Sequence, residues 1–231
     1  MKDREIDDIL RQAAQAPHAV DPALLDRVSR SIGSSLEPVR PLPSAWVLAG
    51  GLVLIGAAVA MAGAAALGFH GIQDLGAVGR AVIFPALGVL IVRAAMACVS
   101  QMVPGSRRLV APGLLLGAGS LVLLAVFALV FHYYRTSHFV SQGVACLVAG
   151  LVLAIPTALG SWLLLRRGFA VNSVAAGLMA GTLAGLAGVT MLELHCANFE
   201  AFHVMLWHTA VVPISAAVGA LLARAVRSRA S

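Results

Sequence analysis

The chain has 231 residues, of which 60% are hydrophobic and only 11% are charged, and its formal net charge is +6. In soluble domains about a quarter of all residues are charged, so this composition excludes an ordinary soluble protein and indicates a membrane protein. The basic residues are spread over several short polar segments, which argues against direct nucleic-acid binding, because a nucleic-acid binder gathers them on one soluble face.

Residues 1–44 form the only long polar segment, with six basic and seven acidic residues. Such a segment is no secretory signal, and we expect it to be a cytoplasmic arm. The stretch DREIDDILRQAAQ predicts one short amphipathic helix. A second helix is expected to begin at Asp21, a good N-cap, with Pro22 in its first turn. EPVRPLP then predicts a stiff linker to the membrane.

The two arm helices carry apolar stripes that they cannot bury by themselves, because helices of about 12 to 15 residues are too small to be stable alone. The partner is the membrane surface, a second copy or another protein. Surface binding requires a basic face, which this mixed arm lacks, so the residues favour a protein partner. The alternative is a partly disordered arm whose helices pack on the inner turns. The stripes comprise Ile6, Ile9, Leu10, Leu24, Leu25, Val28 and Ile32.

Six apolar blocks follow, each long enough at about 20 residues to cross a bilayer as a helix. The alternation of a membrane β-strand is absent, so the sequence predicts an all-α, six-transmembrane-helix bundle over residues 45–223. A basic tail, residues 224–231, ends the chain. Pro85, Pro156 and Pro213 predict local kinks. The expected spans are Trp46 to Leu67, Ala81 to Val103, Pro112 to Phe131, Val140 to Leu165, Asn172 to Glu193 and Phe202 to Ala223.

The distribution of basic residues predicts that both termini are cytoplasmic. Thirteen of the sixteen basic residues flank the spans on the side of the termini, whereas only Arg80 and Arg135 lie on the other side and Arg93 lies inside span 2. The thirteen are Lys2, Arg4, Arg11, Arg27, Arg30, Arg40, Arg107, Arg108, Arg166, Arg167, Arg224, Arg227 and Arg229.

The stretch LELHCANFEAFHVMLWH joins spans 5 and 6 and, in this topology, faces out. Cys146, about two turns into span 4, starts from the same side, so it can meet Cys196, whereas Cys98 lies near the cytoplasmic end of span 2. An outward-facing cysteine pair can form a disulfide, bind a soft metal or switch between such states. In the alternative interpretation, Cys146 is a small packing residue and His195 is an ordinary interface residue.

The histidines of this stretch extend the list of possible metal ligands to Cys146, Cys196, His195 and His203. A metal pair on a helix prefers i, i+4 spacing, whereas His203 and His208 are five residues apart, about 140° round an α-helix. We therefore expect no permanent metal site and no cofactor. Haem would require two facing histidines at membrane depth, and only His208 clearly qualifies.

Span 5 places Gly177, Gly181 and Gly185 four residues apart, which predicts a face for close helix packing. Arg93 lies well inside span 2, where it either marks a transport path or snorkels to the inner surface. No hydrolase motif or phosphate-binding loop is present, so we do not expect an enzyme. A small-molecule transporter or channel and a membrane redox or haem protein are the alternative functions.

The chain resembles the NrsF-type family of membrane anti-sigma factors. The resemblance lies in the short segments ELHC and VMLWH, the six spans and the arm of about 45 residues. The resemblance covers nearly all of the membrane portion. It implies a bacterial inner-membrane protein that holds an extracytoplasmic-function sigma factor and releases it under stress. It also implies that Cys146 and Cys196 correspond to two outer cysteines that sense metals or oxidants. The arm lacks the H-x-x-x-C-x-x-C motif of another anti-sigma class, so zinc in the arm is not expected. The oligomeric state stays open.

Overall fold

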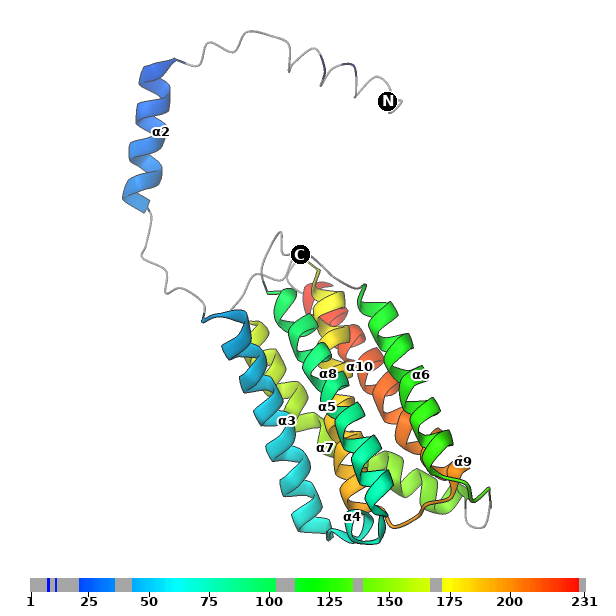
Figure 1. The fold of residues 1–231 in the computed structure, drawn as a ribbon. Helices are drawn as coiled ribbons and strands as arrows, with labels where there is room; N and C mark the ends of the chain where they lie inside the picture. The colour runs from blue at the N-terminus through cyan, green and yellow to red at the C-terminus, as the bar shows by residue number, and fades with distance from the viewer. Residues whose placement is uncertain are drawn as a thin grey trace. The chain divides into compact units, whose positions relative to one another are not determined.

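A computed structural model of the chain describes residues 8, 11, 21–35, 43–102, 111–134, 139–166 and 172–228. All regular elements among these residues are helices, so the all-α prediction is confirmed (Figure 1). They are α2 (Pro22–Ser35), α3 (Ala45–Leu67), α4 (His70–Asp74), α5 (Ala77–Ser100), α6 (Pro112–Val130), α7 (Phe139–Leu165), α8 (Ser173–His195), α9 (Ala201–His203), the π-helix η1 (Val204–His208) and α10 (Thr209–Ser228).

The chain divides into two compact units, Met1–Pro41 and Leu42–Ser231. In the first unit, α2 follows Asp21, whose side chain accepts a hydrogen bond from the Ala23 amide at 2.9 Å. This is the expected N-cap. The predicted apolar stripe is exposed along α2, with Leu24, Leu25, Val28 and Ile32 at 46% to 56% of full exposure. Ile6, Ile9 and Leu10 lie outside the described residues.

The second unit is a bundle in which six helices are long and apolar enough to cross a membrane. The chain runs up and down through it, and α8 lies at the centre (Figure 1). We call the end at which α3 begins the proximal end. The opposite end, which carries α4 and α9, is the distal end. The multi-pass membrane architecture expected from the sequence is confirmed.

Burial explains which helix takes the central place. The α8 span is 72% buried and has the lowest mean hydropathy, 1.6, whereas the α6 span is 11% buried and has the highest, 2.5. A helix surrounded by protein does not need a lipophilic surface, but a helix that faces lipid on most sides does. The composition of each span therefore matches its position in the bundle.

The glycines of α8 bring α10 into backbone contact. A Cβ added at Gly185 would lie 2.7 Å from Val212 Cα, and at Gly177 or Gly181 it would overlap the carbonyl oxygens of Gly219 and Ser215. Only glycine permits this approach. The predicted small-residue face is thus placed against α10 within the bundle.

We expect Gly181→Ala to lower the thermal stability of the bundle, since overpacking a close contact costs about 1–3 kcal/mol. Gly117→Ala in α6 is the matched control, because an added Cβ there meets no heavy atom within 4 Å. Alanine is the better helix former, so the control should be neutral or slightly stabilised. Unfolding midpoints of both variants in one detergent check this. Equal midpoints would contradict the packing account.

The second span begins four residues earlier than the sequence predicted, at Ala77 rather than Ala81. The reason is the side chain of Arg80, whose Nε donates to the Leu75 carbonyl at 2.7 Å and whose Nη2 donates to the Gln73 carbonyl at 3.2 Å. A charged residue can lie in the first turn of the helix because its guanidinium N–H groups donate to backbone carbonyls just before the helix.

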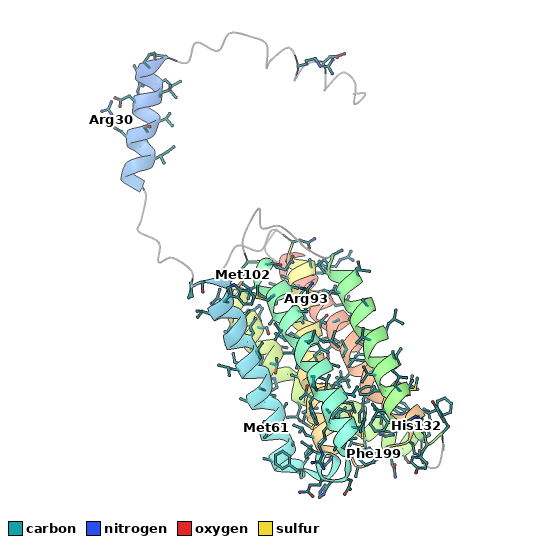
Figure 2. The ribbon with its side chains drawn as sticks, in the orientation of Figure 1. Arg30, Met61, Arg93, Met102, His132 and Phe199 are labelled. Atoms are coloured by element: carbon teal, nitrogen blue, oxygen red, sulfur yellow. The ribbon has the colours of Figure 1, made fainter. Side chains whose placement is uncertain are left out.

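Arg93 is exposed on the outside of the bundle. Figure 2 shows it toward the end that carries Met102, with His132 and Phe199 at the other end. Its guanidinium therefore does not point into the bundle interior, where a residue of a transport path would lie. This position suits a side chain that snorkels to the proximal membrane surface.

Candidate functional site

Three segments meet at the distal end and bring cysteine and histidine side chains together. Cys146 comes from the second turn of α7, and Cys196 is the C-cap of α8, where its amide donates to the Leu192 carbonyl at 2.7 Å. His203 and His208 come from α9 and η1. One ligand atom from each of these four residues lies within 4.8 Å of all the others. We call these four residues the distal cluster.

The link between α8 and α9 is tied down on two sides. The Asn198 side chain donates to Gln142 Oε1 of α7 at 2.8 Å and accepts from the Glu200 amide at 2.9 Å. The Ala201 amide donates to the Tyr133 carbonyl at 2.7 Å. These bonds fix where the last span starts. They therefore also fix the position of His203 along the bundle axis.

The two thiols of the distal cluster are free and lie side by side. Their Sγ atoms are 3.6 Å apart, and Cys196 Sγ is 3.7 Å from His203 Nε2. Both cysteines are half-buried. The hydrogen bond with Cys146 raises the pKa of the Cys196 thiol, and burial raises it further, so Cys196 keeps its proton at neutral pH. The structure thus brings together the two cysteines that the topology allowed to meet.

The π-helix η1 brings the two histidines together despite their five-residue spacing. In a π-helix the hydrogen bonds run from i to i+5, so five residues make about one turn. The rings of His203 and His208 accordingly lie edge to face, with centroids 5.3 Å apart. On the α-helix that the sequence predicted, the two rings would lie about 140° apart. A π-turn has no composition signal that would have revealed it.

Glu193 and His208 form a buried pair that the sequence did not predict. Glu193 Oε1 is 2.6 Å from His208 Nδ1, and the two side chains are 3% and 1% exposed. A buried carboxylate inside a bundle requires such a partner. The contact favours the tautomer in which Nδ1–H donates to Glu193. His208 Nε2 and His203 Nδ1 are buried and have no hydrogen-bond partner among the described residues.

His195 points away from the distal cluster. Its Nδ1 is 3.0 Å from the Gly68 carbonyl, and its ring lies 6.0 Å from that of His70. Gly68 has φ of +102°, a left-handed conformation that favours glycine. His195 therefore joins the end of α8 to the turn after α3.

Helix α4, which the sequence did not predict, closes the distal end of α8. A Cβ added at Gly71 would lie 2.7 Å from the carbonyl oxygens of both Glu193 and Cys196. Gly71 is buried. The backbone beneath the distal cluster is thus held from a second side.

The family comparison covers most of this bundle. A family model described as negative regulator of sigma F matches residues 33–227. No curated protein and no solved structure matches the chain. The matched range contains all six spans and all four residues of the distal cluster. It begins at residue 33 and so leaves out most of α2. With its architecture and this match together, the chain belongs to the NrsF family, the negative regulators of sigma F.

Proposed function

We propose that this membrane anti-sigma factor holds an extracytoplasmic-function sigma factor through its N-terminal arm and releases it when the thiol pair of the distal cluster changes state. The family match supports a negative regulator whose partner is a sigma factor, and a regulatory rather than catalytic role. The role of the arm in binding is supported by the exposed apolar side chains of Leu24, Leu25 and Val28, which lie in a different compact unit from the bundle. Exposed apolar stripes on a soluble helix are typical of helix-in-groove recognition.

The membrane orientation follows from charge. With thirteen basic residues on the side of the termini, the arm faces the cytoplasm, where a sigma factor resides, and the distal cluster faces out. A bacterial inner membrane is the setting in which both conditions hold. The half-buried thiols are then within reach of an external oxidant or metal ion.

The signal acts on Cys146 and Cys196. A thiol oxidant that takes two electrons and two protons from the pair would join the sulfurs, and a soft metal ion would bind them as thiolates. Either change would draw α7 and the end of α8 into a new relative position. Both helices touch α3 nearby, since a Cβ added at Gly63 would lie 2.7 Å from Leu153 Cδ1 and 2.9 Å from Met191 Cγ.

Helix α3 is the span to which the arm is joined, so a shift at Gly63 reaches the arm along one continuous helix. Packed helices have discrete arrangements rather than a continuum, which makes a two-state bundle the natural form of this coupling. Moving the bound fraction from nearly all to nearly none requires the signal to favour the releasing state by about 5.5 kcal/mol.

Retention of a tagged sigma factor tests the proposal. Extracytoplasmic-function sigma factors of the host are produced one at a time with the full chain or with a chain that lacks residues 1–41. We expect one of them to co-purify with the full chain and not with the shortened one, because the sigma-binding helices are gone. Equal retention by the two chains would place the binding surface in the bundle and contradict this role of the arm.

The alternative functions have less support in the geometry. Arg93, on which a transport path depended, is exposed on the outside of the bundle. A haem held by two histidines requires imidazoles that face each other across a slot for the macrocycle. His203 and His208 instead lie edge to face, at an interplanar angle of 76°.

A further inference from the structure

We propose that the distal cluster is a four-ligand site for a divalent d10 metal ion, Zn²⁺ or Cd²⁺, in which Cys146, Cys196, His203 and His208 are the ligands and Glu193 positions His208. The inference deepens the proposed function by naming the ligand of its sensing site, and it rests on that function only for the regulatory consequence.

Two distances within the cluster match those between ligands of one ion. Around a tetrahedral ion with metal–sulfur bonds of about 2.3 Å and metal–nitrogen bonds of about 2.0–2.1 Å, two sulfurs stand roughly 3.8 Å apart and sulfur and nitrogen roughly 3.6 Å apart. The observed separations are 3.6 Å between the sulfurs and 3.7 Å between Cys196 Sγ and His203 Nε2. The four ligand atoms otherwise lie within 4.8 Å of one another, so an ion that binds all four would draw α7, the end of α8 and the last span slightly together.

The two imidazoles are buried without a full set of partners. His203 is 0% exposed and His208 is 1% exposed, yet each has a ring nitrogen with no hydrogen bond among the described residues. A buried polar atom without a partner is destabilising. Coordination by His208 Nε2 would satisfy one of these atoms directly. Coordination by His203 Nε2 would leave Nδ1 as that ring's donor.

Glu193 completes a pattern that is common behind metal-bound histidines. Such a histidine usually donates its second ring N–H to a carboxylate, which fixes the tautomer and makes the ligating nitrogen more basic. Glu193 Oε1 holds His208 Nδ1 at 2.6 Å, and this leaves Nε2 as the nitrogen available to the site. If His208 served only to pair with the buried Glu193 carboxylate, it would not need to lie beside the thiols of Cys146 and Cys196.

The donor set selects the class of ion. Two thiolates and two imidazoles suit borderline and soft ions, whereas Mg²⁺ and Ca²⁺ prefer oxygen ligands. Entry of one divalent ion displaces two thiol protons to the solvent, so the net charge of the site does not change. This balance matters at the distal end, where the cluster is largely buried.

The π-turn η1 is needed for the proposed metal site. It is the local geometry that places two histidines five residues apart on one face, and π-turns inside α-helices occur frequently at functional sites. On a regular α-helix, His208 would lie about 140° round from His203. The metal site therefore depends on a backbone irregularity at one place in the last span.

Titration of the purified full chain with Co²⁺ tests the site, since Co²⁺ in a tetrahedral site with thiolates gives strong visible bands and a sulfur-to-metal charge-transfer band. We expect both to saturate at one ion per chain and to disappear when Cd²⁺ is added. Cys146→Ser should lose about half of the charge-transfer intensity, because one of the two thiolates is gone, and His208→Ala should bind at least tenfold more weakly. Glu193→Gln should keep the spectrum and stoichiometry while losing about 10–100-fold in affinity.

His195→Ala is the matched control, because His195 lies at the same end but outside the ligand group. It should bind as the unchanged chain does. Wild-type chain without the Co²⁺ bands would overturn the site, as would variants of His203 and His208 that bind like the His195 control. The titration contains no sigma factor, so its failure leaves sigma-factor retention untouched, and loss of retention leaves the metal site untouched.

Discussion

The double variant Leu25→Asp, Val28→Asp is expected to lose the sigma factor almost completely. Both side chains are exposed in the free arm, at 56% and 46%, and are proposed to be buried in the complex. Burying an aliphatic side chain contributes about 1.5–3 kcal/mol, so losing two corresponds to roughly 3–6 kcal/mol. At 1.4 kcal/mol per tenfold, affinity should fall by about 10²- to 10⁴-fold.

The measurement is retention of the tagged sigma factor by the full chain. Ala23→Asp with Arg27→Gln is the matched control, because it makes the same change of two charges on the opposite side of α2. The control should retain the sigma factor nearly as well as the unchanged chain. If the two double variants were equally impaired, charge rather than the apolar stripe would govern binding.

Much of the bundle could be predicted because membrane insertion imposes simple rules. Runs of about 20 apolar residues must be helices, so the six spans followed from the sequence. Charge counting gave an expected orientation, and that orientation put Cys146 and Cys196 at one end. Their sulfurs are 3.6 Å apart in the fold. The small-residue spacing of span 5 likewise indicated a close helix contact, which is made with α10.

The chemistry of the distal cluster could not be predicted, because it depends on departures from regular geometry. Helix η1 rephases the last span by a π-turn, so counting at 100° per residue put His208 on the wrong side of His203. Glu193 and His208 meet across a loop, 15 positions apart, and no local spacing rule covers such a pair. The start of α5 was misplaced for a related reason, since Arg80 finds carbonyl partners in the preceding turn.

These differences alter the interpretation of the last span. As an ideal α-helix it would carry scattered histidines, and a metal site would be hard to support. With the π-turn, the same residues converge on a thiol pair that remains half-exposed. The distal end therefore brings two half-buried thiols and two imidazoles together from three helical segments.

Release of the sigma factor from the purified complex is the most direct measurement of the account. Full chain with bound sigma factor is reconstituted in lipid vesicles and treated with Cd²⁺ or with the thiol oxidant diamide. We expect most of the sigma factor to leave the unchanged chain, and to stay bound to Cys146→Ser and Cys196→Ser, because only the pair of thiols can respond.

Cys98→Ala is the control for general thiol damage, since Cys98 is fully buried in α5 and far along the chain from the distal cluster. This variant should release the sigma factor as the unchanged chain does. Equal release from the two serine variants, or full retention by the unchanged chain with both reagents, would contradict the claim that the distal thiols control the arm.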